Sequence, residues 1–273
     1  MKVYKYLNLS RASFLKDGLI RFSQPGALND PYECLPAYPD ELLQLGTNLL
    51  RESIVAQLDD VKEDDPDARK LKKARAHLIV QMLDEEVRKN PSYLRDEYVK
   101  LVTLKMNAGF GIFSLSRRWN SALMWSHYTK AYTGFCVGFD RDHKFFDGFP
   151  DAKGERFPLR SVRYSEVRTL VKDGITDEGD VLDAVLTKSL DWSYEEEERL
   201  VAFLHSAHKV EERSPYNVHL YSVPFDAFSE LIVGHRATDA FKQEVADAAK
   251  ALNIPAYETK VSDLSFDVER KPL

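Results

Sequence analysis

The sequence lacks the short motifs that most often reveal an activity. It contains no Gly-rich dinucleotide fingerprint, no phosphate-binding P-loop and no Gly-x-Ser-x-Gly elbow. These absences argue against a regular nucleotide-binding array of βαβ units, and they disfavour a serine hydrolase. The chain also has no internal repeat and no low-complexity region, which excludes solenoid architectures.

Cysteines and long apolar runs are equally scarce. The two cysteines, Cys34 and Cys136, lie among apolar or aromatic residues and form no Cys-x-x-Cys pair, which favours reduced, buried thiols. The N-terminus lacks the apolar core of a signal peptide, and no run is long enough to cross a bilayer. We therefore expect a cytoplasmic protein without a membrane partner.

Positively charged residues are also fewer than negatively charged ones. The chain has 38 Lys and Arg against 44 Asp and Glu, which gives a net charge of -6. This balance provides no global attraction to nucleic acid or to anionic membranes. Hydrophobic residues make up 44% of the 273 residues and aromatic residues 11%, which is enough to form a core. We therefore expect a folded, well-solvated protein.

Hydrophobic periodicity predicts a mixture of strands and helices. Strand patterns occupy 3–7, 19–23, 110–116, 134–139, 159–164, 197–204, 218–223, 228–233, 256–262 and 266–268. Helical patterns occupy 40–59, 68–88, 92–106, 121–128, 180–190 and 238–252. Their irregular order indicates the α+β class with a mixed or antiparallel central sheet. We expect one domain over 1–273 with residues 40–108 as a helical insertion, because that block is long for one connection.

Four groups of short segments follow one another along most of the chain. They are VYKY at 3–6 with LIRFSQP at 19–25 and LNDPYE at 28–33; FSLS at 113–116 with NSALMWSHY at 120–128 and GFCVGFD at 134–140; Lys188 with Trp192 and YEEEERL at 194–200; and LIVGHR at 231–236. Together these segments resemble the domain-of-unknown-function 2971 family. The combination of NDP at 29–31 with MWSHY at 124–128 is specific. The resemblance implies no particular activity, because none is assigned to this family.

The glutamate run is the first candidate for chemistry. Glu195, Glu197 and Arg199 are two residues apart, so in a strand they would share one face. Two neighbouring carboxylates raise each other's pKa, while an arginine opposes that shift. Such a pair suits acid–base work or binding of a ribose hydroxyl; the alternative is a solvated strand entrance. The family resemblance predicts an aromatic residue at Glu198, which leaves open whether Glu195 and Glu197, or Glu196 and Glu198, face inward.

His127 and the Asn29–Asp30 loop are further candidates. His127 lies between Trp125 and Tyr128 on an expected short helix. It would bind a ligand or act as a base, or else be a core histidine with satisfied nitrogens. The loop at Asn29 and Asp30 would border a site through an Asx turn, or form a purely structural turn.

Motif order suggests one activity. A Tyr-rich first strand, a serine-containing strand and helix, and a Glu-x-Glu strand look like the ADP-ribosyltransferase layout. That likeness implies NAD as substrate, with Glu197 as the catalytic carboxylate, Glu195 orienting the acceptor and His127 in the same site. A fixed negative charge would stabilise the oxocarbenium-like transition state. The residues predicted to bind NAD are Tyr4, Tyr6, Ser23, Asn29, Asp30, Ser114, Ser116, Trp125, Tyr128 and Arg199.

Two other functions fit the same residues. A metal-dependent nuclease or phosphodiesterase would use Asp30, His127, Glu195 and Glu197, since oxygen-rich clusters suit magnesium. A non-catalytic binding module, such as a phage-defence component, would dock a partner on the helical block. We favour the NAD enzyme and predict no bound metal, because His205 and His208 lack a surrounding zincin motif. The macromolecular acceptor stays open.

Overall fold

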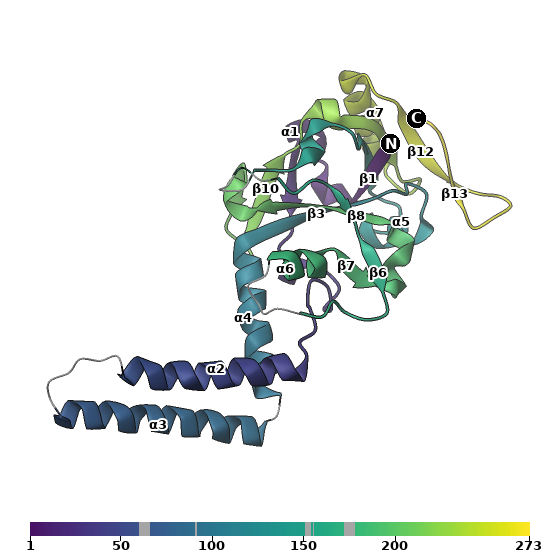
Figure 1. Ribbon diagram of the computed structural model, residues 1–273. Helices are drawn as coiled ribbons and strands as arrows, with labels where there is room; N and C mark the ends of the chain where they lie inside the picture. The colour runs from purple at the N-terminus through teal and green to yellow at the C-terminus, as the bar shows by residue number, and fades with distance from the viewer. Residues whose placement is uncertain (60–65, 91, 151–153, 155, 172–177) are drawn as a thin grey trace. The chain divides into compact units, whose positions relative to one another are not determined.

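The structure is a computed structural model, and the described residues form two compact units (Figure 1). It describes residues 1–59, 66–90, 92–150, 154, 156–171 and 178–273. The first unit consists of Met1–Cys34, Met106–Val167 and Leu186–Leu273, and the second consists of Leu35–Lys105 and Arg168–Val185. The expected single domain with an insertion at 40–108 stays a prediction.

An eight-stranded mixed sheet is the centre of the first unit. Its strand order is β13-β12-β11-β4-β1-β3-β8-β5. The strands are β1 (Lys2–Leu7), β3 (Phe110–Ser116), β4 (Phe135–Asp140), β5 (Arg160–Ser161), β8 (Glu197–Phe203), β11 (Phe228–Val233), β12 (Ala256–Val261) and β13 (Val268–Pro272). Only β11 and β12 run parallel in it, and helix α7 (Asp239–Leu252) makes their crossover. The predicted α+β class with a mixed sheet is confirmed.

Two smaller sheets and several short helices complete this unit. Strands β2 (Leu19–Phe22), β10 (Val218–Ser222) and β9 (Lys209–Glu211) pair antiparallel, and β6 (Arg163–Ser165) pairs parallel to β7 (Thr187–Ser189). The short α-helices are α1 (Phe14–Asp17) and α5 (Ala122–Tyr128). The 3-10 helices are η1 (Leu9–Arg11), η2 (Pro25–Ala27), η3 (Lys144–Asp147), η4 (Leu190–Glu195), η5 (Leu204–Ser206) and η6 (Phe225–Ala227).

Three of the predicted elements need correction. The strand expected over 159–164 is divided between β5 and β6, which belong to different sheets. The helix expected over 180–190 is α6 (Glu178–Val185), and its last residues form β7 instead. The edge strand expected over 266–268 begins only at Val268 and continues to Pro272. In the last two places the chain pairs with another strand, β6 or β12, so tertiary pairing overrides the local pattern.

The two faces of the sheet carry different cores. Phe113 and Leu115 of β3 lie in the larger core, which also contains Phe241 and Val245 of α7. Burying each of these side chains contributes about 1.5–3 kcal/mol. The opposite face carries a smaller cluster that includes Trp125 of α5. The alternation along β3 therefore directs its serines away from the larger core.

The second unit is helical. It contains α2 (Asp40–Asp59), α3 (Pro66–Lys89), α6 and most of α4 (Tyr93–Gly109). Arg51 of α2 forms an ion pair with Asp84 of α3. Within the described part of the chain, no helix is both long and apolar enough to cross a membrane.

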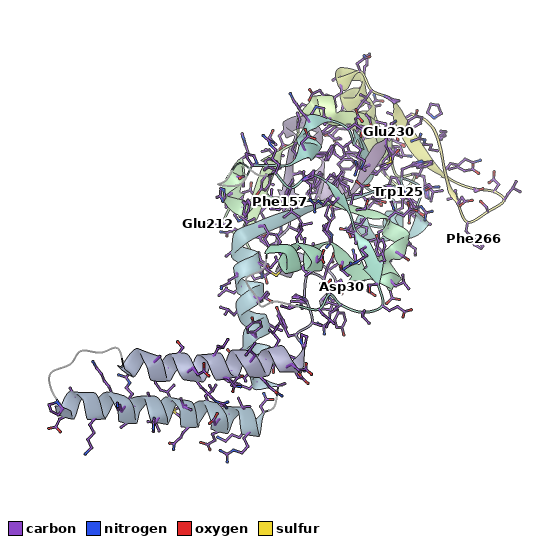
Figure 2. All side chains as sticks on the ribbon, viewed as in Figure 1. Asp30, Trp125, Phe157, Glu212, Glu230 and Phe266 are labelled. Atoms are coloured by element: carbon purple, nitrogen blue, oxygen red, sulfur yellow. The ribbon has the colours of Figure 1, made fainter. Side chains whose placement is uncertain are left out.

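A buried carboxylate joins the first strand to the last. Glu230 of β11 accepts hydrogen bonds from Lys2 Nζ at 2.5 Å, Tyr4 Oη at 3.1 Å and Arg270 Nη1 at 2.7 Å. Burial raises the pKa of Glu230, but its bonds to Lys2 and Arg270 outweigh burial and lower the pKa below its ordinary value. The β12–β13 hairpin, which has the exposed Phe266 near its tip (Figure 2), is tied to the sheet through this cluster.

We expect Arg270→Ala to lower the free energy of unfolding by about 2 kcal/mol, because Glu230 would lose one of its two cationic partners while remaining buried. Urea denaturation measures this loss. Lys260→Ala is the matched control on the same hairpin, where Lys260 meets Glu269 in the open, and it should change little. Equal effects of both substitutions would contradict a special role for the buried pair.

Candidate functional site

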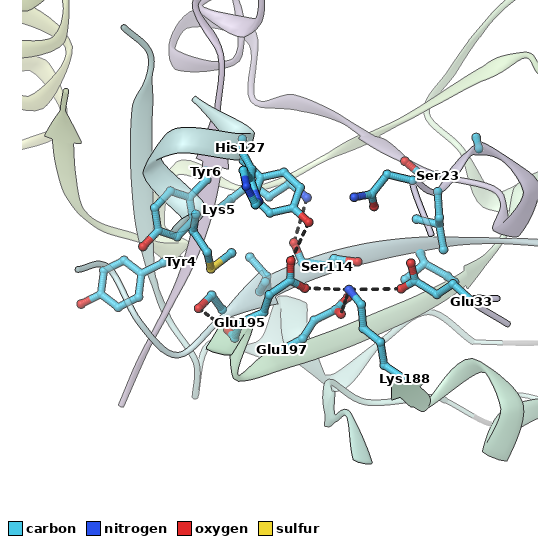
Figure 3. Close-up of a pocket in the computed structure, with 18 residues that line it drawn as sticks. Tyr4, Lys5, Tyr6, Ser23, Glu33, Ser114, His127, Lys188, Glu195 and Glu197 are labelled. Carbon is cyan, nitrogen blue, oxygen red and sulfur yellow. Dashed lines mark hydrogen bonds and ion pairs between the residues drawn. The ribbon is translucent and has the colours of Figure 1, made fainter. Parts of the chain in front are cut away.

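A cavity of about 450 Å³ lies where β1 and β3 part (Figure 3). These two strands have only Tyr4 and Ser116 as registered partners among the described residues. The lining residues are Tyr4, Lys5, Tyr6, Ser23, Ala27, Leu28, Asn29, Glu33, Ile112, Ser114, Leu115, Ser116, Met124, His127, Tyr128, Lys188, Glu195 and Glu197. The volume is typical of small-molecule sites.

One lysine holds three carboxylates together in this cavity. Lys188 Nζ lies 2.6 Å from Glu195 Oε2, 2.9 Å from Glu197 Oε2 and 3.5 Å from Glu33 Oε1 (Figure 3). All four side chains are almost fully buried. Burying a charge is costly unless it is paired, so the cluster depends on these mutual contacts.

Arg199 supports the cluster from behind. It is completely buried and lies outside the cavity lining. Its Nε donates to Glu197 Oε1 at 2.8 Å and its Nη2 donates to Glu197 Oε2 at 3.0 Å, while Nη2 also donates to Glu33. A guanidinium that binds both oxygens fixes a carboxylate in direction as well as in charge. Glu197 is therefore a rigid anion in the cavity wall.

The pKa values of the cluster follow from burial and from these contacts. Burial raises the pKa of Glu197, and the charge of Glu195 raises it further against the opposing charge of Lys188. Burial alone would lower the pKa of Lys188, but Glu197 and Glu195 outweigh it and raise that pKa above its ordinary value. Glu197 and Lys188 consequently hold their protons more tightly than the isolated groups would.

The chain brings Glu195 into the cavity by a turn. Glu195 ends η4, and Glu196 takes a left-handed conformation with φ 43° before β8 begins. The expectation that Glu195 and Glu197 share a strand face is therefore wrong, because Glu195 lies before β8. Both side chains nevertheless reach the cavity. The open question of orientation is settled as well, because Glu196 is partly exposed and Glu198 instead binds Arg141 at 2.7 Å.

Two serines and two α5 residues complete the polar wall. Ser116 Oγ donates to the Glu195 carbonyl at 2.5 Å and so anchors that turn, while Ser114 hydrogen-bonds the Glu197 side chain. Tyr128 Oη donates to Glu195 Oε1 at 2.5 Å. His127 is exposed and lines the cavity next to Tyr128.

Ten of the thirteen predicted site residues line the cavity. The ten are Tyr4, Tyr6, Ser23, Asn29, Ser114, Ser116, His127, Tyr128, Glu195 and Glu197. Tyr4 and Tyr6 already donate their hydroxyl protons, to Glu230 and to the Arg118 carbonyl, so they offer ring surface to a ligand.

Three predicted site residues lie outside the cavity lining. Asp30 accepts from the Tyr32 amide at 2.9 Å in a structural Asx turn. Trp125 is fully buried and donates to the Trp119 carbonyl at 2.7 Å. Arg199 acts on the cavity only through the carboxylates that it binds.

Sequence reasoning missed three charged residues in the cavity. They are Lys5, Glu33 and Lys188. Lys188 and Glu33 stand inside segments that resemble the family, and that position was the available signal. Lys5 also stands inside such a segment, VYKY at 3–6, but a lysine in a Tyr-rich strand normally points to water. Its Nζ instead donates to the Ser114 carbonyl at 2.8 Å.

We expect Lys188→Met to lower the free energy of unfolding by about 3 kcal/mol at neutral pH, because it removes the cation that binds buried Glu195 and leaves Glu197 and Glu33 with Arg199 alone. The pKa values of these carboxylates in the folded state then rise above the unfolded values. The folded state binds more protons in that range, so the variant should gain stability as the pH falls from about 7.5 to about 5.5. Urea denaturation at both pH values measures this gain.

A double variant provides the control for this pH dependence. Adding Glu195→Gln to Lys188→Met removes one of the repelling charges and should restore part of the lost stability at neutral pH. A Lys188→Met protein whose stability is independent of pH would show that the carboxylates do not depend on this cation.

Lys5 should react as an amine with an unusually low pKa. Burial lowers the pKa of Lys5 to about 8, although Glu197 and Glu195 oppose the shift. Competitive acetylation at a series of pH values, read by mass spectrometry, should give a midpoint near pH 8 for the folded protein. The same peptide in urea should show the ordinary lysine midpoint of about 10.4. Identical midpoints in both states would contradict the burial of this amine.

Comparison with known proteins adds one finding to this geometry. No curated protein and no solved structure matches the chain. A family model matches residues 124–200, a span that runs from α5 to the start of β8 and contains His127, Tyr128, Lys188, Glu195 and Glu197. Over these residues the match confirms the resemblance carried by the sequence motifs to the family described as Protein of unknown function (DUF2971).

Proposed function

We propose that the cavity binds NAD and that the protein is an ADP-ribosyltransferase or an NAD glycohydrolase. The observation that carries this proposal is the pair Glu195 and Glu197, two buried carboxylates that meet on one wall of a ligand-sized cavity. They are held by a shared ammonium, that of Lys188. Paired carboxylates at fixed positions are the usual means of breaking glycosidic bonds.

The chemistry asks for a fixed negative charge. When the bond between ribose C1′ and the nicotinamide nitrogen breaks, the bonding electrons leave with nicotinamide and positive charge develops on the ribose. Glu197, held by Arg199 through both oxygens, supplies a preorganised charge that stabilises this state. Water or an acceptor nucleophile then forms the new bond to C1′ and loses a proton, for which Glu195 is the nearby base.

The remaining wall residues suit the rest of the substrate. Ser23, Asn29 and Ser114 offer hydrogen-bonding groups for ribose hydroxyls and for the carboxamide. Tyr128 and His127 offer ring surfaces next to the carboxylates. A cytoplasmic location belongs to the same proposal and is supported by two free, buried cysteines.

Lys188 favours NAD chemistry over the metal-dependent alternative. Its ammonium already lies between the three carboxylates that would otherwise be candidate ligands. Asp30, a fourth candidate ligand, lies outside the cavity lining and binds the Tyr32 amide. The carboxylates are thus paired by the chain's own cation.

We expect Glu197→Gln to reduce nicotinamide release from labelled NAD by about 100-fold or more, as the loss of a preorganised transition-state charge does in other enzymes. Glu195→Gln should reduce transfer as well. Glu196→Gln is the matched control, because that neighbouring side chain is partly exposed and lines no part of the cavity. Turnover by Glu197→Gln at the rate of the parent protein would end the proposed role.

A thermal-shift titration with NAD separates binding from turnover. Ligand at about 100 times its Kd stabilises the folded state by about 2.7 kcal/mol, and Glu197→Gln should retain most of this shift. An activity that is lost on chelation would instead indicate the nuclease. If NAD causes no thermal shift and is not turned over, the non-catalytic binding or phage-defence role remains.

A further inference from the structure

A second cavity of about 430 Å³ lies in the first unit. Its lining comes from η1, β2, η2 and the segment between β9 and β10, which are distant in sequence. The lining residues are Arg11, Arg21, Gly26, Ala27, Leu28, Glu211, Arg213, Ser214, Pro215, Tyr216 and Val218. Apart from Ala27 and Leu28, none of these residues lines the first cavity.

Three arginines give this cavity a strong positive charge. Arg11, Arg21 and Arg213 all line it, and Glu211 is the one acidic residue in the lining. Glu211 is already bound to Lys209 at 2.8 Å, whereas Arg213 Nη2 lies 3.8 Å from it. Burial, and the nearby charge of Arg11, lower the pKa of Arg21. Three arginines against one acid that Lys209 also binds favour an anionic ligand.

Arg21 carries a donor with no partner. Within the described ranges of the chain, its Nε is buried and makes no hydrogen bond. Its Nη2 donates to Gln24 Oε1 only at 3.4 Å. A buried unsatisfied donor is unfavourable, and an oxyanion that draws the guanidinium toward the cavity would satisfy it. Arg21 also sits on a fixed strand, because its neighbours Ile20 and Phe22 are buried in the core.

The wall between the two cavities is held tightly. The Gly26 amide donates to Asn107 Oδ1 at 2.7 Å. A Cβ at Gly26 would lie 2.3 Å from Tyr216 Oη and 2.8 Å from Asn107 Nδ2, so no larger residue fits without displacing these groups. The next two residues, Ala27 and Leu28, line both cavities. A ligand in the second cavity would therefore lie directly beside the first.

We propose that Arg11, Arg21 and Arg213 form a phosphate-binding site beside the carboxylate cavity. Guanidinium groups bind phosphate oxygens through paired, charge-assisted hydrogen bonds, and several together select a doubly charged group over a chloride ion. The phosphate belongs either to a nucleotide that also enters the first cavity or to a separate phosphorylated molecule. The site does not require NAD cleavage, so it stands or falls independently of the proposed function.

Isothermal titration of the full-length protein with inorganic pyrophosphate tests the site. We expect binding that weakens as salt is added. Arg11→Gln and Arg213→Gln change exposed side chains, and each should weaken binding about tenfold. Arg21→Lys keeps the charge but removes the Nε donor, and should weaken binding too. Arg160→Gln, on exposed β5, is the matched control.

Two results would overturn the proposal. One is the absence of pyrophosphate binding at low salt, and the other is an equal loss of affinity in Arg160→Gln. Where pyrophosphate binds, competition with ADP-ribose distinguishes the two sources of phosphate. Competition that disappears in Arg213→Gln supports a nucleotide that spans both cavities, and simultaneous binding supports a separate phosphorylated molecule.

Discussion

The ammonium of Lys188 is the interaction on which the site depends. It joins two parts of the chain that are far apart in sequence, because Glu33 follows β2, whereas Lys188 in β7 lies within ten residues of Glu195 and Glu197. Each carboxylate is buried, and a buried carboxylate without a cation would destabilise the fold. The same contact that makes the cavity acidic therefore also holds its walls together.

The rest of the first unit serves to keep this cluster in place. Aromatic side chains such as Phe113 and Phe139 pack on one face of the sheet, which leaves the other face of β3 and β8 for charged groups. Arg199 is completely buried and places a second positive charge behind the carboxylates. With three carboxylates against Lys188 and Arg199, the cluster is one negative charge in excess, and Lys5 is close enough to compensate it in part. An excess of this sign suits a ligand that becomes positive while it reacts.

Local patterns in the sequence predicted the strands, and thereby the faces, better than they predicted the site. The alternation that places Ser114 and Ser116 opposite Phe113 is visible in four residues and is what β3 shows. Glu195 depends instead on the left-handed backbone of Glu196, which no side-chain pattern announces. Glu33 lies in a loop without periodicity, and the gap that admits Lys5 exists only because β1 and β3 pair so briefly. Such features arise from tertiary structure and are absent from any local window.

Ala27 and Leu28 form the wall that the two cavities share. A larger side chain at either position would reduce the volume of both cavities, and a smaller one would open a connection between them. A substitution at either position therefore changes the dimensions of both cavities together.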